Sequence, residues 1–459
     1  MVRKLVYFAI QLAAIIYAFL VPEGAVIATI IVWLSILFYT VKDMDKHFPL
    51  LSFVLSFFTF LLGGFVFETG HTMTPRLLFQ CHALIASLFF LYVGYAFTEN
   101  NSATIRFQNS ASVITHNSQN IYYSKVRRVS KFLVYLCSVF ALAEVAEQIV
   151  FFRTYSYIEL YSDYKGGMPY IVYKLSNLFT LAAYMYYATL PSKKESKFVN
   201  ILFVSIPLLY LFTGRRGIAI LPLLLYVTYC FIRNHITPNE KWIGRGGILT
   251  LLIASPFVIA LLFVMSQYRQ GESVTSLNTI ESISEFFAQT GSSIDILGMT
   301  YDLRDQLPEH HAFLLGPLYD VFYGSDLHYL FGKSGLSRNT AEFAMSGNSL
   351  GSFLAYNYIT SSYLEGAGVG SCYIAEAYAD LSWFGIIFIS FLYGIILRKI
   401  PKWFNRNLIL SIVSFFILFG LYKAPRAQAF SFVADLLGPT NILIVLIIHL
   451  WAKRKTRKI

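Results

Sequence analysis

Apolar runs of about 20 residues recur along nearly the whole chain of 459 residues, and runs of that length are typical of membrane-spanning helices. Charged residues make up only 13% of the sequence, whereas hydrophobic residues make up 56%. A soluble globular chain is about a quarter charged, so this surface could not keep a water-soluble particle dispersed. The sequence therefore predicts an all-α polytopic membrane protein. It excludes a disordered chain, a disulfide scaffold and a soluble enzyme.

We expect about twelve transmembrane helices, each long enough or nearly long enough for a ~30 Å hydrocarbon core. The predicted spans are residues 5–21, 25–41, 50–67, 77–97, 132–152, 171–190, 198–212, 218–232, 248–265, 373–397, 407–422 and 440–452. Transmembrane helices 1–9 thus occupy residues 1–265, and helices 10–12 occupy residues 372–459. Between them, residues 266–371 form one large loop, with short helices expected on the membrane surface near 312–315 and 350–358.

The positive charge is distributed unevenly over these segments. The net charge is +11, from 36 Lys and Arg residues against 25 Asp and Glu residues. If the N-terminus is cytosolic, most Lys and Arg residues fall in the inner segments, which is the usual bias of membrane proteins. Both termini are therefore predicted to be cytosolic, and the large loop is predicted to lie outside. The basic surplus reflects topology, so we expect the lipid bilayer, and no nucleic acid, as a partner.

A few arginines lie on the outer side, against this bias. They are Arg215, Arg216, Arg269, Arg304, Arg338 and Arg426. A guanidinium group keeps its charge and presents a fork of donors that matches phosphate oxygens. A single interfacial arginine often does no more than extend toward lipid head groups. The adjacent pair in the tight turn between two short spans instead favours binding of an anionic group, and we predict a phosphate.

Two carboxylates and a histidine are candidates for acid–base chemistry. Glu376 and Asp380 are four residues apart, so they share one face at the start of the tenth span. A buried carboxylate either pairs with a cation or serves as a general base. His311, in the large loop, is the second candidate for the base. A salt bridge to an arginine remains the alternative for both acids.

Other features allow weaker predictions. Gly368, Gly370 and Ser371 precede the tenth span, and bare backbone N–H groups at a helix start could bind an anion. Glu144 and Glu147 lie inside the fifth span, where we expect pairing with an arginine, with ion coupling as the alternative. No metal-ligand spacing, phosphate loop or dinucleotide fingerprint is present in the sequence. We therefore predict no metal and no cofactor.

Three patches carry a family resemblance. One is Gly214-Arg215-Arg216-Gly217 at the start of an apolar helix, and another is Pro425-Arg426 between the last two spans. The patch with the strongest resemblance extends from Gly368 to Gly385 and contains both Glu376 and Asp380. With the long outer loop, this layout resembles the Wzy-type O-antigen polymerases, also called oligosaccharide repeat-unit polymerases.

The resemblance implies a multi-pass glycosyltransferase of the bacterial inner membrane. Such enzymes use glycans linked to undecaprenyl pyrophosphate, act on the periplasmic face, and need neither a nucleotide sugar nor a metal. Their fold is similar to that of C-type glycosyltransferases and O-antigen ligases, and a chain-length regulator and a flippase are the implied partners. In this reading the outer arginines bind the pyrophosphate, and Glu376 or His311 is the base.

Alternatives remain open at this point. Some family members have an arginine, ten residues and then a glycine in their outer loops. Here eleven residues separate Arg304 from Gly316, and eleven separate Arg426 from Gly438. The role of that motif therefore does not transfer directly. A lipid-linked oligosaccharide flippase, an ion-coupled transporter and an O-antigen ligase are the alternative functions.

Overall fold

The computed structural model describes residues 2–67, 72–98, 113–154, 166–270, 279–323, 336–404 and 406–456. Within these ranges every regular element is a helix. The first part contains α1 (Val2–Leu20), α2 (Ala25–Val41), α3 (Met44–Phe57), α4 (Gly63–Phe67), α5 (Pro75–Phe97), α6 (Val113–Thr154), α8 (Tyr170–Ala188), α9 (Lys197–Leu209), α10 (Arg216–Ile236) and α11 (Arg245–Gln270). A π-helical segment, η2 (Phe58–Leu62), joins α3 to α4.

The second part contains shorter helices before three long ones. They are α12 (Thr279–Gly291), α13 (Ile294–Asp302), η4 (Arg304–Gln306), η5 (Phe313–Leu315), α14 (Gly316–Tyr323), α16 (Ala341–Ser346), α17 (Leu350–Tyr358), α18 (Thr360–Leu364), α19 (Tyr373–Phe404), α20 (Leu408–Lys423), η6 (Ala424–Arg426), α21 (Phe432–Leu437) and α22 (Pro439–Thr456). The short helices expected near 312–315 and 350–358 correspond to η5 and α17.

The predicted all-α membrane fold is confirmed. Each of the twelve predicted spans falls on helical residues, and the third span covers α3, η2 and α4. Nine of the described helices are long and apolar enough to cross a membrane. The other three predicted spans fold as α8, α9 and α22, which do not meet the same criteria of length, hydropathy and charge.

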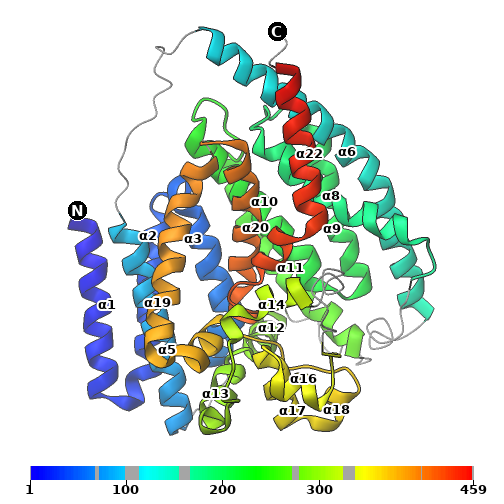
Figure 1. The fold of residues 1–459 in the computed structure, drawn as a ribbon. Helices are drawn as coiled ribbons and strands as arrows, with labels where there is room; N and C mark the ends of the chain where they lie inside the picture. Colours follow the sequence, from blue (N-terminus) through cyan, green and yellow to red (C-terminus); the bar gives the residue numbers. More distant parts are fainter. Residues whose placement is uncertain are drawn as a thin grey trace.

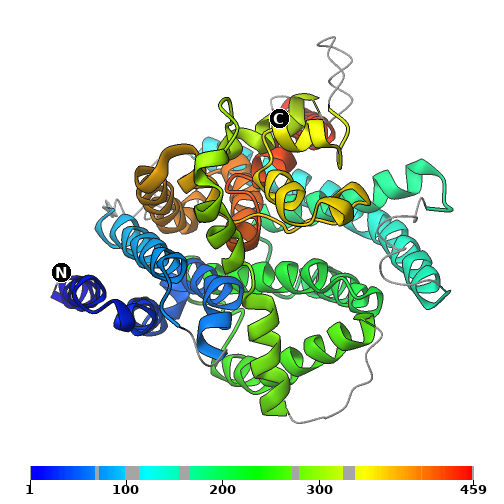
Figure 2. The ribbon, with the colours of Figure 1, turned by 90° about the horizontal axis from the view of Figure 1, so that it is seen from below.

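Different helices lie at the two ends of the molecule. In Figure 1 the short helices α13, α16, α17 and α18 lie at the lower end, whereas α22 ends near the C-terminus at the upper end. Seen from below, the yellow-green and yellow segments lie across the ends of the long helices (Figure 2). We call the end with α13 and α16–α18 the loop side, and the opposite end the terminal side.

Small residues let α5 and α19 pack closely. A Cβ atom added at Gly94 would overlap the Phe391 carbonyl oxygen, and one added at Gly394 would overlap the Leu91 carbonyl oxygen. Such close approach is typical of helix pairs in membranes, where apolar burial alone gives little preference for one partner. These backbone contacts hold the part of α19 around Phe391 and Gly394 against the end of α5.

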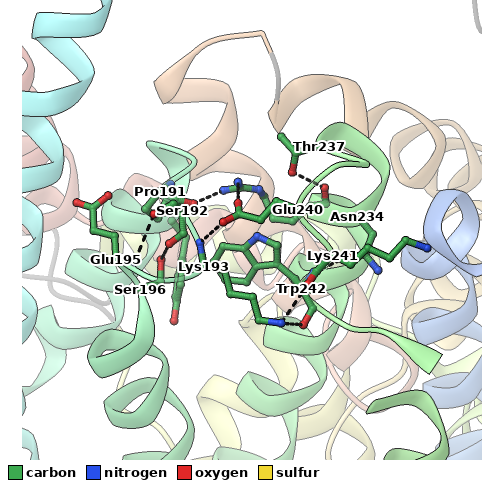
Figure 3. Close-up of polar contacts among 12 residues, drawn as sticks. Pro191, Ser192, Lys193, Glu195, Ser196, Asn234, Thr237, Glu240, Lys241 and Trp242 are labelled. Atoms are coloured by element: carbon green, nitrogen blue, oxygen red, sulfur yellow. Dashed lines mark hydrogen bonds and ion pairs between the residues drawn. The ribbon is translucent and has the colours of Figure 1, made fainter. Parts of the chain in front are cut away.

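A polar network joins two loops on the terminal side (Figure 3). The Arg233 side chain is only 3% exposed and donates to the Pro191 carbonyl oxygen at 2.7 Å. It also pairs with Glu240 at 3.3 Å and lies 4.9 Å from the Trp242 ring centroid. Glu240 accepts a further bond from the Lys193 backbone N–H at 2.7 Å. Because a buried cation needs partners, this network fixes the α8–α9 loop against the α10–α11 loop.

We expect Glu240→Gln to lower the free energy of unfolding by about 1–2 kcal/mol, because it removes the negative charge beside a buried guanidinium. Thermal unfolding of the purified protein in detergent measures the change. The matched control is Glu342→Gln, since Glu342 is exposed on α16. An equal loss of stability in both variants would contradict the role of the network.

Candidate functional site

A cavity of about 540 Å³ lies between α3, α10, α11, α12 and α20. We call it the arginine cavity. Four cationic side chains line it: Arg215, Arg216, Lys423 and Arg426. Much of the remaining wall is apolar, from Leu55, Phe60, Ile218, Ile220, Leu221, Leu224, Leu262, Phe286 and Phe419. Among the described lining residues, none is Asp, Glu or His. The cavity therefore suits an anionic group attached to an apolar one.

The start of α10 places two arginines side by side in this cavity. Gly214 has a φ of 72°, in the left-handed region that glycine adopts without a Cβ penalty. This residue ends the short helix η3 (Tyr210–Thr213), and Arg215 then caps the N-terminus of α10. The turn predicted between these two helices is therefore present, and it brings both guanidinium groups to the cavity wall.

Contacts with neighbouring residues hold the orientation of each guanidinium group. Arg215 Nη1 donates to Gln148 Oε1 at 3.1 Å. Arg216 Nη1 lies 3.5 Å from the Leu262 carbonyl oxygen, and its Cζ atom lies 5.6 Å from the Phe286 ring centroid. Both arginines are half-buried. These contacts pre-set the donors, so less ordering is needed when an anion binds.

The two acidic residues in α6 take part in structural contacts. Gln148 Nε2 donates to Glu144 Oε1 at 3.0 Å, so Glu144 is connected to Arg215 through Gln148. Glu147 accepts from the Tyr173 hydroxyl at 2.6 Å and from the Gly167 N–H at 2.5 Å. Glu144 thus helps to position Arg215 through Gln148. Glu147 connects α6 to the start of α8 and to the segment before it.

The end of α20 supplies the other two cations. Lys423 and Arg426 are exposed, and the Arg426 Cζ atom lies 5.7 Å from the Phe60 ring centroid. Arg426 is in η6, directly after α20. The structure thus brings together three of the six predicted arginines. Lys423 was missed from the sequence, although its spacing of three residues from Arg426 at a helix end could have indicated a shared face.

Glu376 holds the segment that follows Arg426. Its side chain is fully buried, at 0% exposure. One carboxylate oxygen accepts from the Ser371 hydroxyl at 2.6 Å, and the other accepts from the Ala429 backbone N–H at 2.8 Å. Glu376 does not line the arginine cavity. It joins the start of α19 to the chain three residues beyond Arg426.

The predicted glycine-rich anion site lies next to the backbone of Arg426. Gly370 has a φ of 84°, and a Cβ atom there would lie 4.0 Å from the Arg426 carbonyl oxygen. Ser371 is buried and uses its hydroxyl on Glu376. Gly368 is exposed. None of the three lines the arginine cavity, so the structure places this stretch beside Arg426 but not around the same space.

Asp380 and His311 hold a second loop against α19. The Asp380 carboxylate accepts from the Phe313 and Leu314 backbone N–H groups at 3.0 and 2.8 Å, at the start of η5. His311 Nε2 lies 3.0 Å from the Ala379 carbonyl oxygen and 3.7 Å from Asp380 Oδ1, and Nδ1 contacts the Pro308 carbonyl oxygen. All the polar atoms of these two side chains are therefore engaged within the described structure.

Two of the remaining predicted arginines lie elsewhere in the described structure. Arg304 pairs with Asp305 at 3.6 Å and lies 4.5 Å from the Tyr301 ring centroid. Arg338 approaches Asp320 at 4.0 Å and is 74% exposed. Neither lines the arginine cavity. Arg269 falls near the end of α11, where its side chain lies outside the described residues.

The chain was compared with known families, curated proteins and solved structures. No significant match was found among curated proteins or solved structures. A family model described as O-antigen polysaccharide polymerase Wzy matches residues 1–458. The match covers all the helices and both arginine-bearing turns, and it confirms the resemblance seen in the three sequence patches. The chain therefore belongs to the O-antigen polysaccharide polymerase Wzy family.

Proposed function

We propose that this membrane protein polymerises oligosaccharide repeat units carried on undecaprenyl pyrophosphate, and that the pyrophosphate lies in the arginine cavity. Family membership supports polymerisation of O-antigen repeat units, and the apolar helices support multi-pass insertion in a membrane. The observation that carries the finer proposal is one cavity lined by four cations and apolar walls.

The four cations suit the chemistry of the leaving group. When a glycan leaves undecaprenyl pyrophosphate, negative charge grows on the phosphate oxygen that is released. Donors already fixed in place stabilise such charge without reorganising. Arg215 and Arg216 are held by Gln148 and Phe286, and each can offer a fork of donors to phosphate oxygens. Lys423 would add a compact positive charge.

The apolar wall suits the lipid part of the same molecule. Leu221 and Leu224 on α10 and Phe419 on α20 line the cavity with the cations. Each buried CH₂ group of a lipid contributes about 0.8 kcal/mol. An isoprenoid chain whose first units lie against these residues could continue into the surrounding bilayer. A soluble phosphate compound would gain nothing from this wall, so the proposed ligand is a lipid pyrophosphate.

The direction of the helices places this cavity toward the loop side. Arg216 is the first residue of α10, and Arg426 follows the last residue of α20. Both line the cavity together with α12, so the start of α10 and the end of α20 lie at the same end of the molecule as α12. We assign that end to the periplasm, because most Lys and Arg residues fall in the segments predicted to be cytosolic. The fixed cations would supply the charge that a metal ion otherwise provides, so we propose metal-independent transfer. A flippase and a chain-length regulator are the expected partners.

Three predicted catalytic residues receive a different role in this proposal. Glu376 and Asp380 each accept two hydrogen bonds from the protein, and both ring nitrogens of His311 contact backbone carbonyl oxygens. None of them lines the arginine cavity. We propose that they are positioning residues, which hold the segment after Arg426 and the loop at η5 against α19.

The proposal is tested with purified protein in proteoliposomes that contain the lipid-linked repeat unit, without nucleotide sugars and with a chelator present. We expect a ladder of products that differ by one repeat unit. Transfer of a single glycan to added lipid A-core would identify a ligase instead. Movement of the substrate across the bilayer without a new covalent product would identify a flippase, and either outcome would overturn the proposal.

A further inference from the structure

A second pocket, of about 340 Å³, lies on the loop side next to the arginine cavity. We call it the polar pocket. It is lined by Gly64, Phe65, Thr72, Thr74, Arg76, Leu77, Gln80, Gly291, Ser292, Ile294 and Asp295. These residues come from α4, from α12, from the segments before α5 and α13, from the first two turns of α5 and from the first turn of α13. Hydroxyl, amide, guanidinium and carboxylate groups are therefore grouped around one space.

The polar pocket and the arginine cavity share a wall. Phe286 and Thr290 of α12 line the arginine cavity, and the next residues, Gly291 and Ser292, line the polar pocket. A Cβ atom at Gly291 would overlap the Gly64 nitrogen, so α12 crosses α4 in close backbone contact. A ligand whose pyrophosphate lies in the arginine cavity would thus have its first sugar near the polar pocket.

The groups in the polar pocket are those that recognise sugars. Hydroxyl groups of a sugar both donate and accept, so they bind best where carboxylate, amide and guanidinium groups converge. Arg76 and Asp295 are partly exposed, at 35% and 55%, so both charged groups are accessible to a sugar. The lining carries both positive and negative charge, which a purely phosphate-binding site would not.

Two carboxylates approach Arg76, and Asp295 has the longer contact of the two. Asp302 forms a 2.7 Å ion pair with Arg76 and accepts from the Tyr358 hydroxyl at 3.3 Å. The nearest approach of Arg76 to the Asp295 carboxylate is 3.8 Å. Burial raises the pKa of Asp295 and Arg76 lowers it, with a net increase. A carboxylate with a raised pKa is a better proton acceptor near neutral pH.

We propose that the polar pocket binds the attacking sugar of the acceptor repeat unit, and that Asp295 takes the proton from its hydroxyl. This inference rests on the function proposed above. The hydroxyl oxygen forms the new bond to the anomeric carbon of the donor glycan. The bond from that carbon to the phosphate oxygen breaks, its electron pair leaves with undecaprenyl pyrophosphate, and the hydroxyl proton moves to the Asp295 carboxylate.

The first test compares Asp295→Asn, Asp295→Glu and Asp305→Asn in proteoliposomes. We expect Asp295→Asn to lower the transfer rate at saturating acceptor about 100-fold or more, with partial recovery in Asp295→Glu. Binding of sugar-free undecaprenyl pyrophosphate should be unchanged in both. Asp305→Asn is the control, since that side chain is 84% exposed on the same loop, and it should match the wild type. A rate within threefold of wild type for Asp295→Asn would overturn the assignment.

The second test fills the pocket without altering a charged group. Thr72 is exposed and lies outside any helix, so Thr72→Trp can be accommodated by the fold. We expect the KM for the acceptor to rise about tenfold or more, while binding of undecaprenyl pyrophosphate stays as in the wild type. An unchanged KM would overturn the subsite. If instead the wild-type protein forms no ladder, the proposed function fails, whatever these variants do.

Discussion

Arg215→Ala and Arg216→Ala are each expected to lower polymer formation by about 100-fold or more, since removing one preorganised oxyanion donor typically costs 10²–10³ in rate. Both guanidinium groups line the arginine cavity and are held there by the protein. Without one of them, the charge that grows on the leaving pyrophosphate loses a fixed partner. A lysine at either position should recover only part of the rate, because it lacks the planar fork.

The measurement is the length and yield of polymer, from cells and from proteoliposomes, with the amount of protein in the membrane determined in parallel. Arg338→Ala is the matched control, because Arg338 is 74% exposed and does not line the cavity. It is expected to retain polymer of normal length. Normal polymer in both Arg215→Ala and Arg216→Ala would remove the pyrophosphate assignment, whereas loss of the protein from the membrane would indicate a folding defect.

The helices could be predicted from the sequence because the constraint is local. A run of apolar residues has no stable alternative to a helix in a bilayer, since each backbone polar group must be satisfied within its own segment. The turn at Gly214 was also readable, because a glycine next to two arginines interrupts an apolar run. The number of crossings was harder to predict: the apolar runs predicted twelve spans, whereas nine of the described helices meet the criteria of length and hydropathy, and α8 and α9 do not.

The composition of the site was only partly readable. Arg215 and Arg426 could each be selected from the sequence, because each is a positive charge on the predicted outer side, where Lys and Arg are less common. That both line one cavity depends on how α10 packs against α20. One of the two partners of Glu376 is the backbone N–H of Ala429, and no residue type in the sequence signals such a bond. Arg76 follows the same outer-side pattern as the selected arginines, so the same argument applied to the start of α5 could have found it.

Glu376→Gln separates the two roles considered for that residue. The glutamine side chain has one acceptor oxygen and one donor nitrogen, so it cannot accept from both Ser371 and Ala429. A buried donor left without an acceptor costs about 1–3 kcal/mol. With the glutamine oxygen on the Ala429 N–H, the Ser371 hydroxyl loses its acceptor, and with the oxygen on Ser371, the Ala429 N–H faces an NH₂ group. Either arrangement weakens the contact that holds the segment after Arg426. We expect undecaprenyl pyrophosphate to bind about 5- to 100-fold more weakly, with polymer yield reduced in step.

Titration of sugar-free undecaprenyl pyrophosphate into the purified variant measures this effect directly. A general base would give the opposite pattern, with unchanged binding and a loss confined to turnover, and that result would contradict the positioning role. Ser371→Ala is the matched control, because it removes only one of the two bonds and leaves the Ala429 N–H paired. Its binding should lie between those of the wild type and Glu376→Gln. This order follows only if Glu376 acts through the backbone that carries Arg426 into the cavity.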